Sequence, residues 1–223
     1  MSQLNLEEQE QIEQIKAIWR RYGTLVLTLL TLVLGSYVGW SQWERYQQGQ
    51  SLKASAMFDE LDKAVADRDT TKANLVFSDI KARYPKTLFA QQAGLLVAKY
   101  QFDANQINEA QAALTWVSDN ATNQEYQAVA RLRLAGLLIE ENKLDDALRL
   151  VEKSPSEAFE GLVADRRGDI LMAQGKQPDA IQAYTQAWKL LPGSLAYRRV
   201  VEAKLGALGV EVNAQTASAG TDQ

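Results

Sequence analysis

The sequence predicts an all-α fold, in which one N-terminal transmembrane helix precedes a solenoid of helical repeats. Three observations lead to this prediction. The run from Tyr22 to Trp43 includes no charged side chain. After this run, helix-favouring residues recur with a spacing of about 3.6 residues, and the alternation of β-branched residues that is typical of strands is missing from the sequence. Alanines also recur at a nearly constant interval, which indicates a repeated helical unit.

The predicted transmembrane helix covers residues 22–43. At about 1.5 Å per residue it reaches roughly 33 Å, enough to cross a hydrocarbon core of about 30 Å. Aromatic side chains typical of membrane interfaces lie near both ends: Trp19, Tyr22, Tyr37, Trp40, Trp43 and Tyr46. A cleaved signal peptide has an apolar run of about 7 to 15 residues and a small-residue cleavage site, which this run lacks. We therefore expect an uncleaved signal anchor in contact with membrane lipid, with a buried globular helix as the alternative.

Basic residues near the span give its expected orientation. Three precede it and two follow it: Lys16, Arg20 and Arg21, then Arg45 and Lys53. This small excess favours a cytoplasmic N terminus, so that residues 1–21 form a short cytoplasmic segment. The remainder then lies across the membrane, which in a bacterium is the periplasmic side of the inner membrane. We expect a single-pass protein.

Gly35 and Gly39 form a G-x-x-x-G pattern within the span. Small residues four apart let a second helix approach closely, so this face is a candidate interface with another membrane helix. The pattern also occurs by chance, because glycine is frequent in membrane helices.

The soluble domain, residues 44–207, shows a repeat. Alanines recur at a nearly constant step along the chain: Ala73, Ala110, Ala147 and Ala180. Four residues after each stands a large side chain: Phe77, Leu114, Val151 and Tyr184. Twelve residues before the last three stands a small one: Ala98, Ala135 and Gly168. The tetratricopeptide repeat has a period of about 34 residues and small residues where its two helices cross, so these spacings predict a tetratricopeptide-like solenoid.

Both ends of the solenoid have a predicted structure. Residues 45–66 are expected to continue the membrane helix and to pack on the first unit through Leu52, Phe58, Leu61 and Val65. Residues 194–207 suit a capping helix. Residues 208–223 are rich in Ala, Ser, Thr and Gly, and we expect a disordered tail there.

The composition excludes several function classes. The 223 residues contain no His and no Cys, so zinc sites of Cys and His, thiol nucleophiles and Ser-His-Asp triads are impossible. We expect no catalytic residues, no metal and no cofactor, and hence no enzyme. The net charge of −4, with both signs well mixed, gives no electrostatic footprint for nucleic acid.

A candidate peptide groove follows from the repeat register. The first helix of each unit is expected to direct Phe102, Ile139 and Met172 into the groove. The polar residues around them are Lys99, Asp103, Glu140, Asp165 and Asp169. An apolar floor with a charged edge can hold a peptide segment of a partner. The alternative is that the three apolar side chains fill the core between helices.

The whole pattern resembles the YfgM-like family of ancillary SecYEG translocon subunits. The matching pieces are residues 8–16 leading into Trp19, the Gly39-Trp40 end of the span, residues 132–135, residues 164–169 and Gly175-Lys176. The resemblance implies association with the SecYEG translocon and cooperation with the membrane-anchored periplasmic chaperone PpiD in handling secretory and outer-membrane proteins. It supplies no catalytic motif.

The main hypothesis is therefore a non-enzymatic, membrane-anchored adaptor that binds other envelope proteins. The alternative from another class is a self-associating structural scaffold for envelope assembly or cell division. The sequence leaves the ligand of the groove open.

Overall fold

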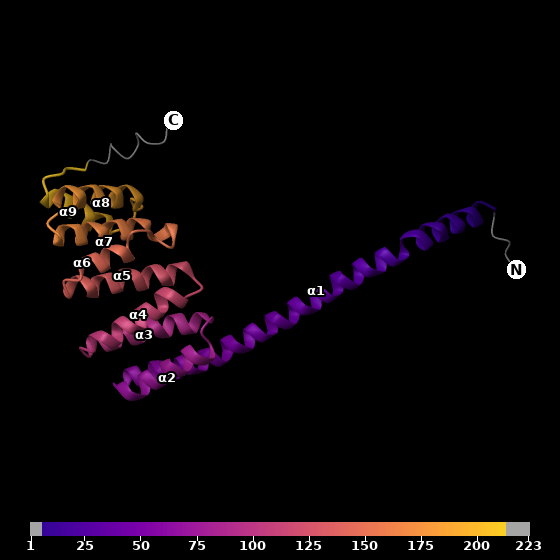
Figure 1. Ribbon diagram of the computed structural model, residues 1–223, viewed down its shortest axis with the longest axis horizontal. Helices are drawn as coiled ribbons and strands as arrows, with labels where there is room; N and C mark the ends of the chain where they lie inside the picture. Colours follow the sequence, from indigo (N-terminus) through magenta and orange to yellow (C-terminus); the bar gives the residue numbers. More distant parts are fainter. Residues whose placement is uncertain (1–5, 213–223) are drawn as a thin grey trace. The chain divides into compact units, whose positions relative to one another are not determined.

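The computed structural model describes residues 6–212, and every regular element in that range is helical (Figure 1). The helices are α1 (Leu6–Ala66), α2 (Thr70–Arg83), α3 (Leu88–Asp103), α4 (Ile107–Asn120), α5 (Gln124–Glu140), α6 (Leu144–Leu150), the 3₁₀ helix η1 (Glu157–Phe159), α7 (Glu160–Ala173), α8 (Gln177–Leu190) and α9 (Arg198–Ala207). The all-α prediction is confirmed. The chain divides into two compact units, Met1–Gln50 and Ser51–Gln223, and α1 contributes to both.

Within the first unit, α1 carries an exposed apolar surface. Leu25 is 68% exposed and Leu32 is 63% exposed, although both are large hydrophobic residues. The hydroxyls of Thr28 and Thr31 donate to carbonyl oxygens four residues earlier, each at 2.8 Å, so these polar groups are satisfied within the helix. By length and composition, the stretch that starts at Trp19 holds one candidate membrane span.

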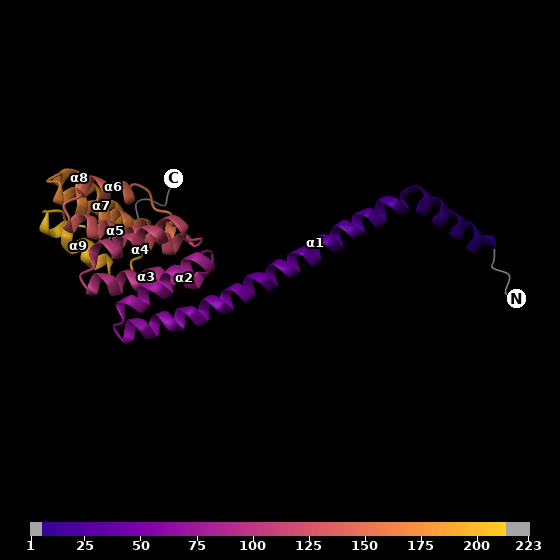
Figure 2. The ribbon, with the colours of Figure 1, turned by 60° about the horizontal axis from the view of Figure 1, so that its bottom comes forward.

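Within the second unit, the helices from α2 to α8 follow one another in chain order, and α9 packs on α8 (Figure 1). The view of Figure 2 again shows α2 and α8 at opposite ends of the stack. Each helix packs on its neighbour along the chain, as in α3 with α4 and α7 with α8. Buried apolar side chains form three clusters along the stack, the first of which extends from Leu61 to Leu137.

The turns between paired helices repeat with the predicted period. One residue in each turn has a left-handed backbone, with φ between 57° and 79°: Arg68, Asn105, Asn142, Gly175 and Gly209. The middle three turn residues stand five positions before the repeat alanines Ala110, Ala147 and Ala180, respectively. At each turn the next N–H donates to the carbonyl five residues back, as Gln106 does to Gln101 at 2.8 Å and Val210 does to Leu205 at 3.0 Å. This bond closes a helix C terminus, so five helices end in the same way.

These turns define the repeat register. The end of α1 and helices α3, α5, α7 and α9 are the first helices of successive units, and α2, α4, α6 and α8 are the second helices. In α3, α5 and α7 a small residue stands seven positions before the left-handed turn residue, where the two helices of the unit cross: Ala98, Ala135 and Gly168. At Gly168 the two helices approach closely, because an added Cβ would lie 2.4 Å from Cε1 of Tyr184. The predicted tetratricopeptide-like pairing of helices is confirmed.

Helix α9 ends the solenoid. Its residue at the crossing position is Glu202, which is exposed, where α3, α5 and α7 have Ala or Gly. A charged side chain there does not suit a second packed helix, whereas Val201 and Leu205 on the other face are fully buried. The expected capping helix is therefore present, as α9.

Two expectations at the ends of the solenoid do not hold. Leu52 is 74% exposed, so the C-terminal part of α1 packs on the first helical repeat through Phe58, Leu61 and Val65 but not through Leu52. The sequence predicts a disordered tail that begins at Leu208. Residues 208–212 instead pack on the last cluster through alternate apolar side chains. Residues 213–223, the rest of that predicted tail, lie outside the described residues.

Candidate functional site

The inner groove is a hollow of about 460 Å³ on the face formed by the first helices α3, α5 and α7. Its lining includes four residues predicted from the sequence: Lys99, Phe102, Asp103 and Glu140. The other lining residues are Ala98, Leu114, Arg133, Gly136, Leu137 and Arg166. The structure thus brings the α3 and α5 members of the predicted groove together around one hollow.

The three apolar residues of the predicted groove differ in burial. Phe102 is 41% exposed and lines the inner groove. Ile139 and Met172 are half-buried and pack against core clusters, Ile139 with Val163 and Ala135 and Met172 with the cluster of α7, α8 and α9. Phe102 is therefore the apolar side chain best placed to touch a ligand, and the other two also contribute to the core.

Asp165 and Asp169 lie in a polar cluster that joins α7, α8 and α9. Lys204 of α9 donates to both oxygens of Asp165, at 2.8 and 2.9 Å, and to Oδ1 of Asp169 at 2.6 Å. The hydroxyl of Tyr197 donates to Asp165 at 2.7 Å, and that of Tyr184 donates to Asp169 at 2.8 Å. Asp165 is only 2% exposed, so its carboxylate is occupied inside the protein and does not lie at the groove's edge.

The cluster also changes the acidity of its two tyrosines. Burial raises the pKa of the Tyr184 hydroxyl, and its hydrogen bond to Asp169 raises it further. Burial and the hydrogen bond to Asp165 raise the pKa of Tyr197 in the same way. Both phenols therefore stay protonated as donors to the two carboxylates.

Six of the lining residues were not assigned to the groove by the sequence analysis, and three of them bear on its charge and shape: Arg133, Gly136 and Arg166. The step along the chain from Arg133 to Arg166 equals the step from Ala147 to Ala180. The two arginines therefore hold equivalent positions in successive units. An alignment of the repeats that includes polar as well as apolar positions would have paired them. Gly136 lies beside Arg166, since an added Cβ would be 3.8 Å from its Nη1.

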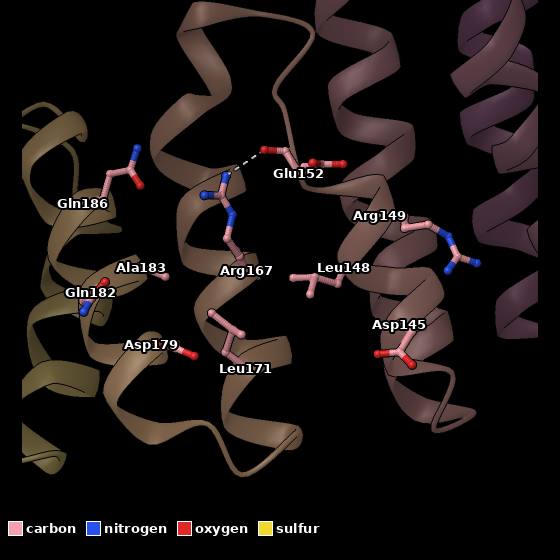
Figure 3. A pocket seen from close by; sticks show the side chains of 10 residues that line it. All are labelled: Asp145, Leu148, Arg149, Glu152, Arg167, Leu171, Asp179, Gln182, Ala183 and Gln186. Atoms are coloured by element: carbon pink, nitrogen blue, oxygen red, sulfur yellow. Dashed lines mark hydrogen bonds between the residues drawn. The ribbon is translucent and has the colours of Figure 1, made fainter.

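A second hollow, of about 650 Å³, lies between α6, α7 and α8 (Figure 3). It exists because α6 has 7 residues whereas α2, α4 and α8 have 14 each. Arg167 of α7 donates to the backbone oxygens of Val151 and Glu152, at 3.4 and 3.1 Å, and so satisfies carbonyls beyond the early end of α6. Because this arginine is engaged in that way, we interpret its role here as structural.

The remaining predicted positions are on α1. An added Cβ at Gly35 or Gly39 would meet no atom of the described residues within 4 Å, so the glycine face is open. Among the described residues no group of His, Cys, Asp or Glu has the arrangement of a metal site.

Comparison with known proteins places this geometry in a family. Residues 16–210 match the family described as tetratricopeptide repeat-like domain. The chain belongs to this family. An ancillary SecYEG translocon subunit of Neisseria gonorrhoeae is 29% identical over 205 residues, which cover 92% of this chain and 98% of that relative.

Two further relatives of the tetratricopeptide repeat-like chain carry the same description. The ancillary SecYEG translocon subunit of Haemophilus influenzae is 27% identical over 204 residues, 92% of this chain and 98% of that relative. The one of Escherichia coli is 26% identical over 179 residues, 79% of this chain and 85% of that relative. These similarities confirm the resemblance to the YfgM-like family of ancillary translocon subunits.

Proposed function

We propose that this chain is a non-enzymatic, membrane-anchored adaptor that acts beside the SecYEG translocon. Residues 22–43 cross the bacterial inner membrane once, residues 1–21 lie in the cytoplasm, and the helical repeats lie in the periplasm. There the inner groove holds segments of envelope proteins, either a chaperone such as PpiD or a secretory client. The observation that carries this proposal is the presence, in one chain, of a candidate span and an open groove in a repeat domain whose relatives are named as translocon subunits.

The anchor has a physical consequence for binding. Confinement to a membrane raises the effective concentration of the repeat domain near any partner in the same membrane. A weak groove contact therefore suffices for a specific complex at the translocon. The lining of the groove mixes apolar and charged residues, and the desolvation of its polar groups costs part of the binding energy.

Photo-crosslinking in intact membranes tests the proposal directly. A photoreactive amino acid at Phe102 should crosslink to a translocon subunit, a periplasmic chaperone or a secretory protein, identified by mass spectrometry. The matched control is Leu75 on α2, which is 65% exposed and lies outside the groove. Crosslinks confined to a second copy of this chain would instead support the self-associating scaffold, and equal crosslinking from both positions would contradict a groove function.

The open glycine face of α1 is proposed to contact another membrane helix. Gly35→Leu with Gly39→Leu fills that face and should reduce the amount of translocon that co-purifies. Val33→Leu with Tyr37→Leu is the matched control, because each lies two residues, about 200°, away from a glycine on the helix. If the glycine variant retains the translocon as well as the control does, this face is not the interface.

A further inference from the structure

The inner groove has a pair of arginines at its centre. Arg133 of α5 and Arg166 of α7 both line the hollow, from equivalent positions in neighbouring units. Gly136 lies next to Arg166, and its missing side chain leaves the space above the backbone open. The groove thus contains two guanidinium groups and, beside Arg166, a vacant position.

These two charges are poorly compensated. Within the described residues Arg133 forms no ion pair, and its hydrogen bond to the backbone oxygen of Leu95 is long, at 3.4 Å. Among the described residues Arg166 has one ion-pair partner, Asp169, at 3.9 Å. That carboxylate already accepts from Lys204 and Tyr184. Two neighbouring cations with little compensation favour an anion between them.

The other charged residues that line the groove are Lys99, Asp103 and Glu140. Lys99 and Asp103 form an ion pair with each other, so they add little net charge. Glu140 is exposed, stands at the C-terminal end of α5 and forms no ion pair among the described residues. Asp103 likewise ends α3, and the ends of helices carry partial negative charge. The groove is therefore positive at Gly136 and negative one helical turn later.

We infer that the inner groove recognises an extended peptide segment in which an acidic side chain stands two positions from a basic one. This inference rests on the proposed function of the groove and names the ligand class. The acidic carboxylate lies between Arg133 and Arg166 above Gly136, where guanidinium groups can hold it with two hydrogen bonds each. The basic side chain lies at Glu140, and an apolar residue of the segment covers Phe102.

The spacing follows from helix and strand geometry. Gly136 and Glu140 are four residues apart on α5, which is about 6 Å along a helix axis. An extended chain advances about 3.3 Å per residue, so two residues cover the same distance. Successive side chains of an extended segment alternate in direction, and residues two apart point the same way. Both charged side chains can thus face the groove together.

Binding of labelled peptides to the full chain in lipid nanodiscs tests this inference. The probe is a nine-residue peptide with capped ends, an aspartate, a lysine two positions later and a phenylalanine beside them, followed by fluorescence anisotropy. We expect Asp→Asn in the peptide to weaken binding by roughly tenfold, which is the scale of one solvated charge-assisted contact. Arg133→Gln with Arg166→Gln should weaken the aspartate peptide equally, and leave the asparagine peptide unchanged.

A second variant tests the vacant position. Gly136→Leu fills it without a change of charge, and should also reduce binding of the aspartate peptide. Arg199→Gln, at an exposed arginine of α9 outside the groove, is the matched control for removal of an arginine, and should have no effect on binding. Circular dichroism of each variant confirms that the helices remain folded. A double mutant that does not fold is replaced by the single change Arg133→Gln, because Arg133 makes only the one weak contact among the described residues.

The outcomes separate this inference from the proposed function. If the arginine variants bind the aspartate and asparagine peptides as the wild type does, the inference is wrong. Crosslinks from Phe102 to translocon or chaperone proteins that persist in those variants would then leave the adaptor function intact. If an uncapped C-terminal carboxylate restores binding of the asparagine peptide to the wild type, the recognised group is a chain end, and the internal-acid form of the inference is overturned.

Discussion

The centre and the C-terminal end of the inner face differ, although the repeat places equivalent residues in both. Gly136 of α5 and Asp169 of α7 occupy the same position in successive units, since each comes three residues after the paired arginine of its helix. At Gly136 the position is vacant and borders the inner groove. At Asp169 it is filled by a carboxylate that binds Lys204 of α9.

Equivalent positions of the same repeat thus contribute to stability at the C-terminal end and, in our proposal, to binding at the centre. The closed end is held by ionic and tyrosine hydrogen bonds among three helices, with Asp165 almost fully buried. The open centre has two arginines with few partners among the described residues. A repeat protein needs a cap at its end, because the terminal helix has no following unit to cover it. The two carboxylates of the cap are satisfied by Lys204 and the two tyrosines, whereas the arginines of the centre have few partners among the described residues.

The largest expected effect is at the closed end. Lys204→Met removes the cation that neutralises buried Asp165, so its carboxylate keeps a charge without a compensating partner. Removal of one member of a buried ion pair costs about 3 kcal/mol or more, and we expect about 3 kcal/mol because Lys204 is partly exposed. Urea denaturation of the full chain in detergent measures the loss.

Lys189→Met is the matched control for this prediction. Lys189 is exposed in the last turn of α8 and has no ion pair among the residues that the structure describes. Its replacement should change the free energy of unfolding by less than about 0.5 kcal/mol. Equal effects of the two substitutions would show that the cluster at α9 contributes no special stability. Faster hydrogen exchange in α9 than in α3 of the Lys204 variant would locate the loss at the cap.

A smaller effect is expected from two glycines in these regions. Gly168→Ala places a Cβ 2.4 Å from the ring of Tyr184, whose hydroxyl is fixed by Asp169. Overpacking typically costs about 1–3 kcal/mol, and higher helix propensity offsets about 1 kcal/mol of it, so we expect a net loss of up to about 2 kcal/mol. Gly136→Ala meets only Arg166 at 3.8 Å and should be neutral or stabilise by up to about 1 kcal/mol.

Thermal denaturation of the two alanine variants checks the contrast. A loss at Gly168 and none at Gly136 would confirm that the first glycine is required by packing and the second is not. Comparable losses would mean that the open space at Gly136 is occupied in the folded protein, which contradicts the vacant centre.

Much of this contrast follows from the sequence, because apolar periodicity determines which helix faces pack. The alanine interval predicted the helix pairs and the crossing at Gly168, and the need of a terminal repeat for a cap predicted the helix near residues 194–207. Asp165 and Asp169 could not be assigned from the same pattern. Their burial depends on Lys204, which is 39 and 35 residues away from them in sequence and reaches them only through the packing of α9. From sequence alone a charged residue is predicted to be exposed, because charged side chains are buried only when they are paired.

The arginine pair was hidden for a related reason. Arg133 and Arg166 are ordinary solvated residues when each is read on its own helix, and their relation appears only once the register aligns α5 with α7. The shortness of α6 was likewise not predicted. Val151 has the apolar character of a helical position, yet the helix ends at Leu150 because the chain turns toward Ser154 and Pro155.

The smallest expected effect under neutral conditions is the pH dependence of the cap. The pKa of Tyr184 is raised in the folded protein, so the folded state holds the phenolic proton more tightly than the unfolded state. Stability from this group is complete below the ordinary tyrosine pKa of about 10 and is lost as the pH rises above that value. Denaturation between pH 8 and 11 should therefore show a decline that begins near pH 10.

Tyr184→Phe isolates the contribution of this hydroxyl. The variant loses the hydrogen bond to Asp169, so it should be less stable by about 1 kcal/mol at pH 8 and should decline less steeply above pH 10. If Tyr184→Phe declines as steeply as the wild type, its proton is not linked to folding. The closed end would then owe its stability to Lys204 and its two carboxylates, with the tyrosine acting through packing against Gly168 alone.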